Sequence, residues 1–162
     1  MNMKRIAWLS FGALLLSIIS FGCASKKDLQ DAAVCKVWKE SALGNTYADL
    51  EEGRAIVRQS CVIGNTGCDT KEAYFVNGTE IHMKGKLAPF NGKVGGFSKG
   101  KLTLTPPGLF KAMAPDKIEW KTESVLVSTT VMGHTGIAEY FFNKKCSPEQ
   151  IALGTLVLAY GK

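Results

Sequence analysis

The sequence predicts a mainly β fold, a small antiparallel barrel or sandwich that ends in a C-terminal helix. Short runs in which apolar and polar residues alternate recur along the chain, as in residues 101–105 and 117–121. Turn signals separate these runs, the clearest being Asn77-Gly78. A helical pattern with its own N-terminal cap comes only near the end, after Ser147. Many short strands and one late helix are typical of this fold class.

Composition supports one globular domain. The chain has 162 residues, of which 46% are hydrophobic and 21% are charged. A disordered chain would combine lower hydrophobicity with a higher net charge. The 20 basic and 14 acidic residues give a net charge of +6.

The N-terminus has the pattern of an export signal. Lys4 and Arg5 precede residues 6–22, which carry no charge. This run is shorter than the roughly 20 apolar residues that a spanning helix needs, and it is typical of a secretory signal peptide. Its end, Ser20-Phe21-Gly22-Cys23, resembles the lipobox of bacterial lipoproteins, in which a small residue precedes the cysteine that is acylated. The motif departs from that family at Ser20, where an aliphatic residue is usual, and ordinary secretion is the alternative.

The lipoprotein resemblance implies three segments. Residues 1–22 would be the signal peptide, 23–33 a lipidated polar tether, and 34–162 a single β-rich domain. The protein would then be lipid-anchored in the bacterial cell envelope, at the outer membrane. Removal of Lys4 and Arg5 leaves 18 basic and 14 acidic residues, a net charge of +4.

Four further cysteines, in an exported chain, indicate two disulfides. They are Cys35, Cys61, Cys68 and Cys146. Three pairings are possible, and we favour Cys61–Cys68 with Cys35–Cys146. Cys61 and Cys68 flank a Gly-Asn turn signal at residues 64–65, and the other pair would join the two ends of the domain. Clustered spacing of the kind that binds zinc is missing, so we predict no metal site.

The individual elements follow from local pattern. Residues 34–43 fit a strand or a helix, residues 47–54 a helical turn or a loop, and residues 55–63 a strand. Asn77-Gly78 predicts a two-residue hairpin turn that places Val76 opposite Thr79 and Tyr74 opposite Ile81. Tyr74, Val76, Ile81 and Met83 would then share one face. We also expect Ile118 and Trp120 to point inward.

Two further strands, over residues 124–132 and 137–142, would be joined by a turn at 133–136. The final helix begins with Ser147 as cap, proline in the first turn and Gln150 completing a capping box. Leu153, Leu156, Val157 and Tyr160 form one apolar stripe for packing on the sheet. Gly154 is expected to weaken this helix by about 1 kcal/mol relative to alanine.

The sequence contains no complete catalytic motif. Residues 95–101 match G-x-x-x-x-G-K, but Leu102 stands where a phosphate-binding loop needs Ser or Thr, so a glycine-rich hairpin is preferred. His82 and His134 are the two histidines, and His82 lies two residues from Glu80. A hydrolase that uses either histidine is the least favoured reading. The sequence therefore predicts a non-enzymatic protein without a cofactor.

A lysine-rich segment is the strongest regional asymmetry of charge. Residues 81–115 contain no acidic residue, and three phenylalanines are interleaved with the lysines. The lysines are Lys84, Lys86, Lys93, Lys99, Lys101 and Lys111. Such a surface suits lipid headgroups, lipopolysaccharide or the carboxylates of peptidoglycan. The alternative is that the lysines protect exposed strand edges. Nucleic acid is excluded as a partner because arginine is absent here and the chain is exported.

Behind a lipoprotein signal, a small β meander with a terminal helix resembles the lipocalin-like proteins of the bacterial envelope. The resemblance covers about residues 34–146 and implies a barrel. The family's Gly-x-Trp is absent, since Lys36-Val37 precede Trp38. We therefore expect a lipid-anchored module that binds an apolar ligand or a partner. The alternative is an inhibitor or assembly factor without a small-molecule pocket.

Overall fold

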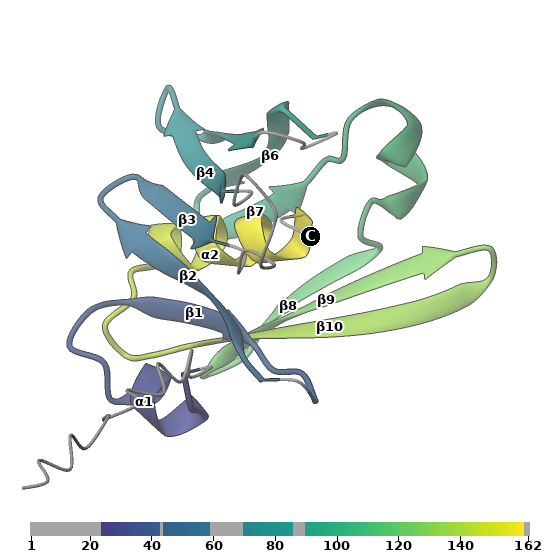
Figure 1. Ribbon diagram of the computed structural model, residues 1–162. Coiled ribbons are helices and arrows are strands. Elements are labelled where there is room, and N and C mark those ends of the chain that lie inside the picture. Colours follow the sequence, from purple (N-terminus) through teal and green to yellow (C-terminus); the bar gives the residue numbers. More distant parts are fainter. Residues whose placement is uncertain (1–23, 43, 59–69, 86–89, 161–162) are drawn as a thin grey trace, which may run out of the picture.

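The computed structural model describes residues 24–42, 44–58, 70–85 and 90–160. Its ten strands form one antiparallel sheet that curls into a nearly closed barrel, as the sequence predicted (Figure 1). The sheet order is β7-β6-β5-β4-β3-β2-β1-β10-β9-β8. The strands are β1 (Lys36–Lys39), β2 (Thr46–Glu51), β3 (Arg54–Arg58), β4 (Thr70–Val76), β5 (Glu80–Gly85), β6 (Gly92–Ser98), β7 (Lys101–Leu104), β8 (Lys117–Trp120), β9 (Ser124–Val131) and β10 (His134–Phe142). The helices are α1 (Lys26–Gln30), the 3₁₀ helix η1 (Gly108–Met113) and α2 (Pro148–Tyr160).

Helix α2 occupies the interior of the barrel. The predicted capping box is present, with Gln150 N donating to Ser147 Oγ at 3.2 Å and Ser147 N to Gln150 Oε1 at 2.9 Å. Every residue from 151 to 158 is buried, so the helix packs on all its sides and not by a single stripe. The reason lies in its composition, because a helix that is apolar all round is stable only when it is surrounded. Figure 1 shows α2 between the upper strands β3–β7 and the lower strands β1 and β8–β10.

Two glycines let the helix and the sheet approach closely. A Cβ atom at Gly154 would lie 2.6 Å from the Cβ of Val37 on β1. A Cβ atom at Gly95 on β6 would lie 2.3 Å from the carbonyl oxygen of Thr103 and 2.9 Å from a methyl group of Leu156. Gly154 therefore has two effects. It lowers the helix propensity of α2, as expected, and it allows the helix to fit against β1.

The segment expected to be a polar tether contains a helix docked on the sheet. Ser25 caps α1 and exchanges hydrogen bonds with Asp28 in a capping box. Leu29 is 2% exposed, and the ammonium group of Lys26 lies over the ring of Phe141. The tether prediction rested on a polar composition, but one apolar side chain and a good cap suffice for a short helix when a sheet surface receives it.

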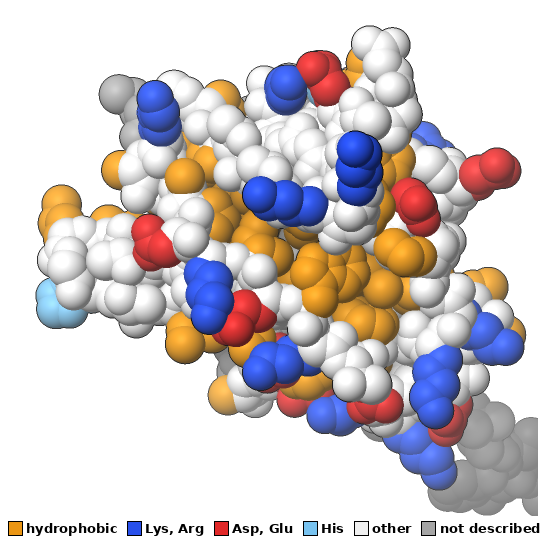
Figure 2. All heavy atoms as spheres, turned by 180° about the vertical axis from the view of Figure 1, so that it is seen from behind, with side chains coloured by type: hydrophobic (Ala, Val, Ile, Leu, Met, Phe, Trp, Pro, Cys, Tyr) orange, Lys and Arg blue, Asp and Glu red, His pale blue; other side chains and the backbone are white. Residues whose placement is uncertain are grey.

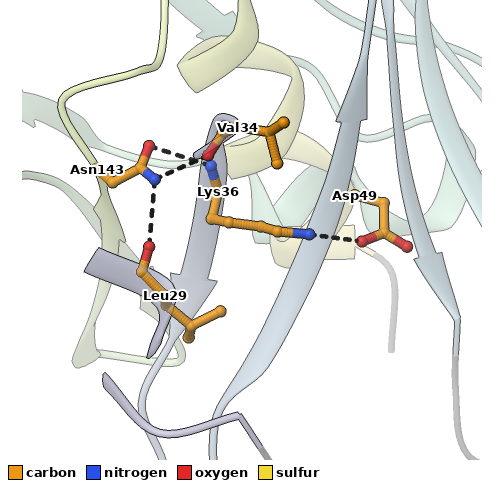
Figure 3. A network of polar contacts seen from close by, with 5 residues as sticks. All are labelled: Leu29, Val34, Lys36, Asp49 and Asn143. Carbon is orange, nitrogen blue, oxygen red and sulfur yellow. Dashed lines mark hydrogen bonds and ion pairs between the residues drawn. The ribbon is translucent and has the colours of Figure 1, made fainter. Parts of the chain in front are cut away.

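Asn143 joins α1 to the barrel. Its buried carboxamide donates to the carbonyl oxygens of Leu29 at 3.2 Å and Val34 at 2.8 Å, and its oxygen accepts from Lys36 N at 3.2 Å (Figure 3). Lys36 in turn pairs with Asp49 on β2 at 3.0 Å. The predicted disulfide Cys35–Cys146 is present in the same region. The polar network and the disulfide therefore hold the N-terminal segment to the residues that lead into α2.

The hairpin of β4 and β5 differs from its predicted register. Asn77 and Gly78 adopt the positive φ angles expected of this turn, at 51° and 74°. Thr79, however, is an extra residue that bonds to β6 through Phe97, so Val76 pairs with Glu80. A slip of one residue moves the whole set of side chains on a strand to the other face. Tyr74 and Val76 are consequently outside, whereas Ile81 and Met83 are buried as predicted.

Three local predictions also need correction. Residues 46–51 form β2, because strands on both sides supply hydrogen bonds that local sequence does not reveal. The turn before β10 is Met132-Gly133, and residues 134–136 belong to the strand. Trp120 is 37% exposed because β8 is an edge strand, while Ile118 is half-buried against the core.

Candidate functional site

The two histidines lie on strands that are not neighbours in the sheet. Nε2 of His82 lies 3.2 Å from Glu80, whose carboxylate also accepts from Lys93 Nζ at 2.7 Å. The hydrogen bond from Lys93, followed by that from His82, lowers the pKa of Glu80 below its ordinary value. Glu80 is thus held as an anion between two basic side chains. His134 is exposed on β10, which is not a neighbour of the strand that carries His82.

The lysines of the basic segment are distributed over several elements. Lys93 is neutralised by Glu80, and Lys84 lies across from Glu72 on the neighbouring strand. The absence of acidic residues from this stretch of sequence is therefore partly balanced in space by other strands. Lys111 lies on η1, and Lys86 is outside the described residues. Lys99 is the first residue of the turn between β6 and β7, and Lys101 is the first residue of β7.

The seam of the barrel is where two of these lysines meet a second basic element. Strands β7 and β8 are the two ends of the sheet, and each has a hydrogen-bonded neighbour on one side only. Between them lies an open groove of about 390 Å³, which we call the seam groove. It is lined by Lys99, Gly100, Lys101, Leu102, Thr103, Leu104, Pro115, Asp116, Lys117, Ile118 and Trp120.

The seam groove combines apolar walls with a basic border. Trp120 offers a half-exposed indole whose ring centre is 6.2 Å from that of Phe97. Lys117 pairs with Glu119 at 2.9 Å, and this hydrogen bond lowers the pKa of Glu119. Figure 2, seen from behind, shows hydrophobic side chains gathered across the middle of that face with basic side chains beside them. Asp116 is the one acidic residue in the lining, and Lys99 and Lys101 leave the groove with a basic excess even though Lys117 pairs with Glu119. Such a groove suits an anionic group with an apolar portion.

Sequence reasoning found half of this groove. Lys99 and Lys101 were candidate site residues, whereas Lys117 and Trp120 were not. Closure of the barrel brings residues 99–104 against residues 115–120, and no local pattern reports which edges will meet. The available signal was the alternation of residues 117–120, which identified a strand with charges on one face.

A second groove lies at the start of α2 and has a larger volume, about 510 Å³. Glu51, Glu52 and Lys145 contribute opposite charges to its lining, and Ser147 and Gln150 already cap the helix. Its charges are mixed and its helix terminus is satisfied, so it offers no preferred ligand chemistry.

Two tyrosine phenols lie in the interior. Burial raises the pKa of Tyr140 to about 12, and burial together with the nearby Tyr140 raises that of Tyr160. Among the described residues, no set of three or more His, Cys, Asp and Glu side chains is placed to hold a metal ion. Cys23, Cys61 and Cys68 lie outside the described residues, so the Cys61–Cys68 pairing stays a prediction.

No match to this chain was found among protein-family models, curated proteins or solved structures. Within the part of the chain that the structure describes, neither α1 nor α2 has the length and apolar character needed to cross a bilayer. Any functional assignment therefore depends on the sequence patterns and on the geometry above.

Proposed function

We propose that this protein is a lipid-anchored, non-enzymatic protein of the bacterial cell envelope that binds an anionic partner at the seam groove. The observation that carries the proposal is the groove itself, whose lining includes Lys99, Lys101 and Lys117 together with the half-exposed indole of Trp120. Basic side chains beside an aromatic ring favour phosphate or carboxylate groups attached to apolar or sugar moieties.

The filled interior favours binding on the outside of the barrel. A lipocalin-like carrier needs a hollow barrel, because its ligand replaces solvent inside. Here Leu153, Leu156 and Val157 of α2 are at most 1% exposed and occupy that space. An apolar ligand would have to displace a capped helix from its core. We therefore place the alternative, an interaction protein without an internal pocket, ahead of a carrier of small apolar molecules.

The lipobox-like ending at Cys23 supports the anchor, and the docked N-terminal segment gives it a consequence. The carbonyl oxygen of Ala24 accepts a hydrogen bond from Asn45 at 3.0 Å, and Ser25 already caps α1. Since one residue spans at most about 3.6 Å, an acylated Cys23 would hold the domain directly against the bilayer. Cys23→Ser should release the protein from membranes, and a mutant that stays in the membrane fraction would disprove the anchor.

Binding at the seam groove is tested with the mature chain carrying Cys23→Ser. The seam variant changes Lys99, Lys101 and Lys117 to glutamine. A matched control changes Lys27, Lys84 and Lys144, three exposed lysines outside the groove, and loses the same charge. The probes are phosphatidylglycerol vesicles, phosphatidylcholine vesicles and purified peptidoglycan, which separate phosphate from carboxylate sources.

The expected result is selective for the groove. Each lysine near an anionic surface contributes about 1 kcal/mol, so the seam variant should bind an anionic probe about 100-fold more weakly. The control should lose far less, and salt should weaken binding because exposed charges are screened over about 8 Å at physiological ionic strength. Equal losses in both variants, or no preference of the unmutated chain for anionic probes, would refute the proposal.

A further inference from the structure

The end of the β9–β10 hairpin projects from the barrel and is solvated on both faces (Figure 1). We call residues 130–137 the distal hairpin. All eight are exposed, and three of them are large apolar side chains: Val131 is 39% exposed, Ile137 68% and Met132 96%. Isolated apolar residues on a surface need no explanation, but an apolar group at the tip of a projecting ribbon indicates a contact.

This hairpin also carries no formal charge. Residues 124–138 contain neither Asp, Glu, Lys nor Arg, although a chain with 21% charged residues would place about three in such a stretch. Solvated β ribbons ordinarily carry charges, which keep them soluble and prevent edge-to-edge pairing. The eight exposed residues of the distal hairpin all lie within this uncharged stretch, which indicates an environment in which a charge would be costly.

The backbone of Met132 adds an independent observation. Its φ angle is 52°, in the left-handed region that favours glycine, asparagine and aspartate. The corresponding residues of two other hairpins are polar, Asn77 and Lys99. Met132 is almost fully exposed, so packing within this chain does not compensate for its unfavourable conformation.

Some polar groups of the distal hairpin are paired with each other. The hydroxyl groups of Thr130 and Thr135 are 2.8 Å apart and hydrogen-bonded. The ladder continues to the last pair, Val131 with His134, next to the two-residue turn. Burial of polar groups is costly mainly when they lack partners. Among the described residues, β9 pairs with β8 only as far as Ser128 and β10 pairs with β1 only from Phe141, so the outward backbone groups of the tip have no neighbouring strand. The apolar side chains of the tip, and not its backbone, are therefore the part that can leave water at a small cost.

We infer that the distal hairpin inserts into the lipid bilayer as a second membrane contact beside the N-terminal anchor. A protein partner fits less well, because a standard interface buries about 800 Å² on each side and three apolar side chains on a narrow ribbon supply much less. A bilayer needs only a small apolar projection when an anchor keeps the domain nearby, since membrane attachment commonly combines two weak signals. The membrane setting rests on the proposed function, whereas the apolar tip does not.

The experiment places an indole at the tip. Met132→Trp is compared with Met113→Trp, where the replaced methionine is 44% exposed on η1. Each mature chain is attached to phosphatidylcholine vesicles through Cys23, by natural acylation or by coupling its thiol to a maleimide lipid. Vesicles with brominated acyl chains quench an inserted indole. Emission from the mature chain without either substitution, which retains Trp38 and Trp120, is subtracted.

Insertion predicts a shift of the Met132→Trp emission to shorter wavelength and its loss with brominated lipid, and neither change for Met113→Trp. In the unanchored Cys23→Ser chain, Met132→Asp should lower partitioning into phosphatidylcholine vesicles about tenfold or more, whereas Met113→Asp should not. Equal quenching at both positions overturns the inference. The inference is also overturned if the unanchored chain forms a dimer that Met132→Asp abolishes, because the tip would then bind a second copy of the chain. The maleimide arm keeps the test valid if Cys23 is not acylated in the cell.

Discussion

Replacing Gly154 by alanine tests whether α2 is enclosed by the barrel. Helix propensity and packing against Val37 predict changes of opposite sign in the free energy of unfolding. On helix propensity alone, Gly154→Ala should stabilise the protein by about 1 kcal/mol. In the structure, the new Cβ atom would lie 2.6 Å from both Cβ and Cγ2 of Val37 and 3.0 Å from Cγ1. Ordinary carbon–carbon contacts are about 3.5–4.0 Å.

The magnitude follows from how little these atoms can move. Val37 is fully buried on β1, with strands bonded on both sides, so its Cβ atom is fixed by the backbone. Overpacking a core in this way costs about 1–3 kcal/mol, and contacts that are short by about 1 Å place the cost at the upper end. After the gain in propensity, we expect Gly154→Ala to lower the free energy of unfolding by about 2 kcal/mol.

Urea unfolding followed by circular dichroism, with the disulfide intact, measures this change. Gly136→Ala is the matched control, since a Cβ atom there would meet nothing closer than 3.9 Å and the effect should stay within about 0.5 kcal/mol. Val37→Ala removes two of the three contacting atoms, so the double variant should be less destabilised than the sum of the single changes, by at least about 0.5 kcal/mol. A Gly154→Ala protein as stable as the parent would refute the enclosed packing of α2.

Three further changes test other parts of the fold. Asn143→Ala should cost about 2–4 kcal/mol of unfolding free energy, because it leaves the carbonyl oxygens of Leu29 and Val34 without their donor. Loss of the disulfide in a Cys35→Ser, Cys146→Ser chain should cost about 4–5 kcal/mol on chain-entropy grounds, given the separation of 111 residues, and an unchanged urea midpoint would contradict this. Stability should also fall in alkali. The unfolded chain releases the Tyr140 proton near pH 10 and the folded protein near pH 12. The free energy of unfolding should therefore be unaffected by this group below pH 10 and fall by about 2–3 kcal/mol as the pH rises to 12. Tyr140→Phe should flatten that loss, as unfolding measured at pH 9, 10, 11 and 12 will show.

Local sequence patterns correctly predicted the elements that neighbouring residues determine. The capping box at Ser147 and Gln150 and the inward leucines of β7 follow from neighbouring residues and are present. The register of the β4–β5 hairpin was wrong although its turn was identified, because a third strand takes the hydrogen bond of Thr79 and adds one residue to the loop. A one-residue error of this kind is not visible in a hairpin considered alone.

The parts that sequence reasoning missed arise from tertiary closure. One apolar stripe was seen in α2, but whether a helix lies on a sheet or within it depends on how far that sheet curls. The helix α1 was not predicted because Leu29 is a single apolar residue among polar ones. Its stabilising effect depends on the surface of β1 and β10, which the local sequence does not reveal. Only one border of the seam groove was predicted for the same reason, since its two borders are 11 or more residues apart in the chain.

The position of α2 explains why the barrel has a groove at its seam. The helix packs more extensively against β1–β4 than against β6 and β10, so it lies off-centre within the sheet. Gly154 permits the closest approach, on β1. Toward β6 and η1, Phe90 packs between Phe110 of η1 and Tyr160 of α2, and Phe97 of β6 belongs to the same core cluster. The edges β7 and β8 are the two ends of the sheet and have no backbone pairing with each other. An outward groove bordered by lysines is thus a direct consequence of a barrel that is filled from one side.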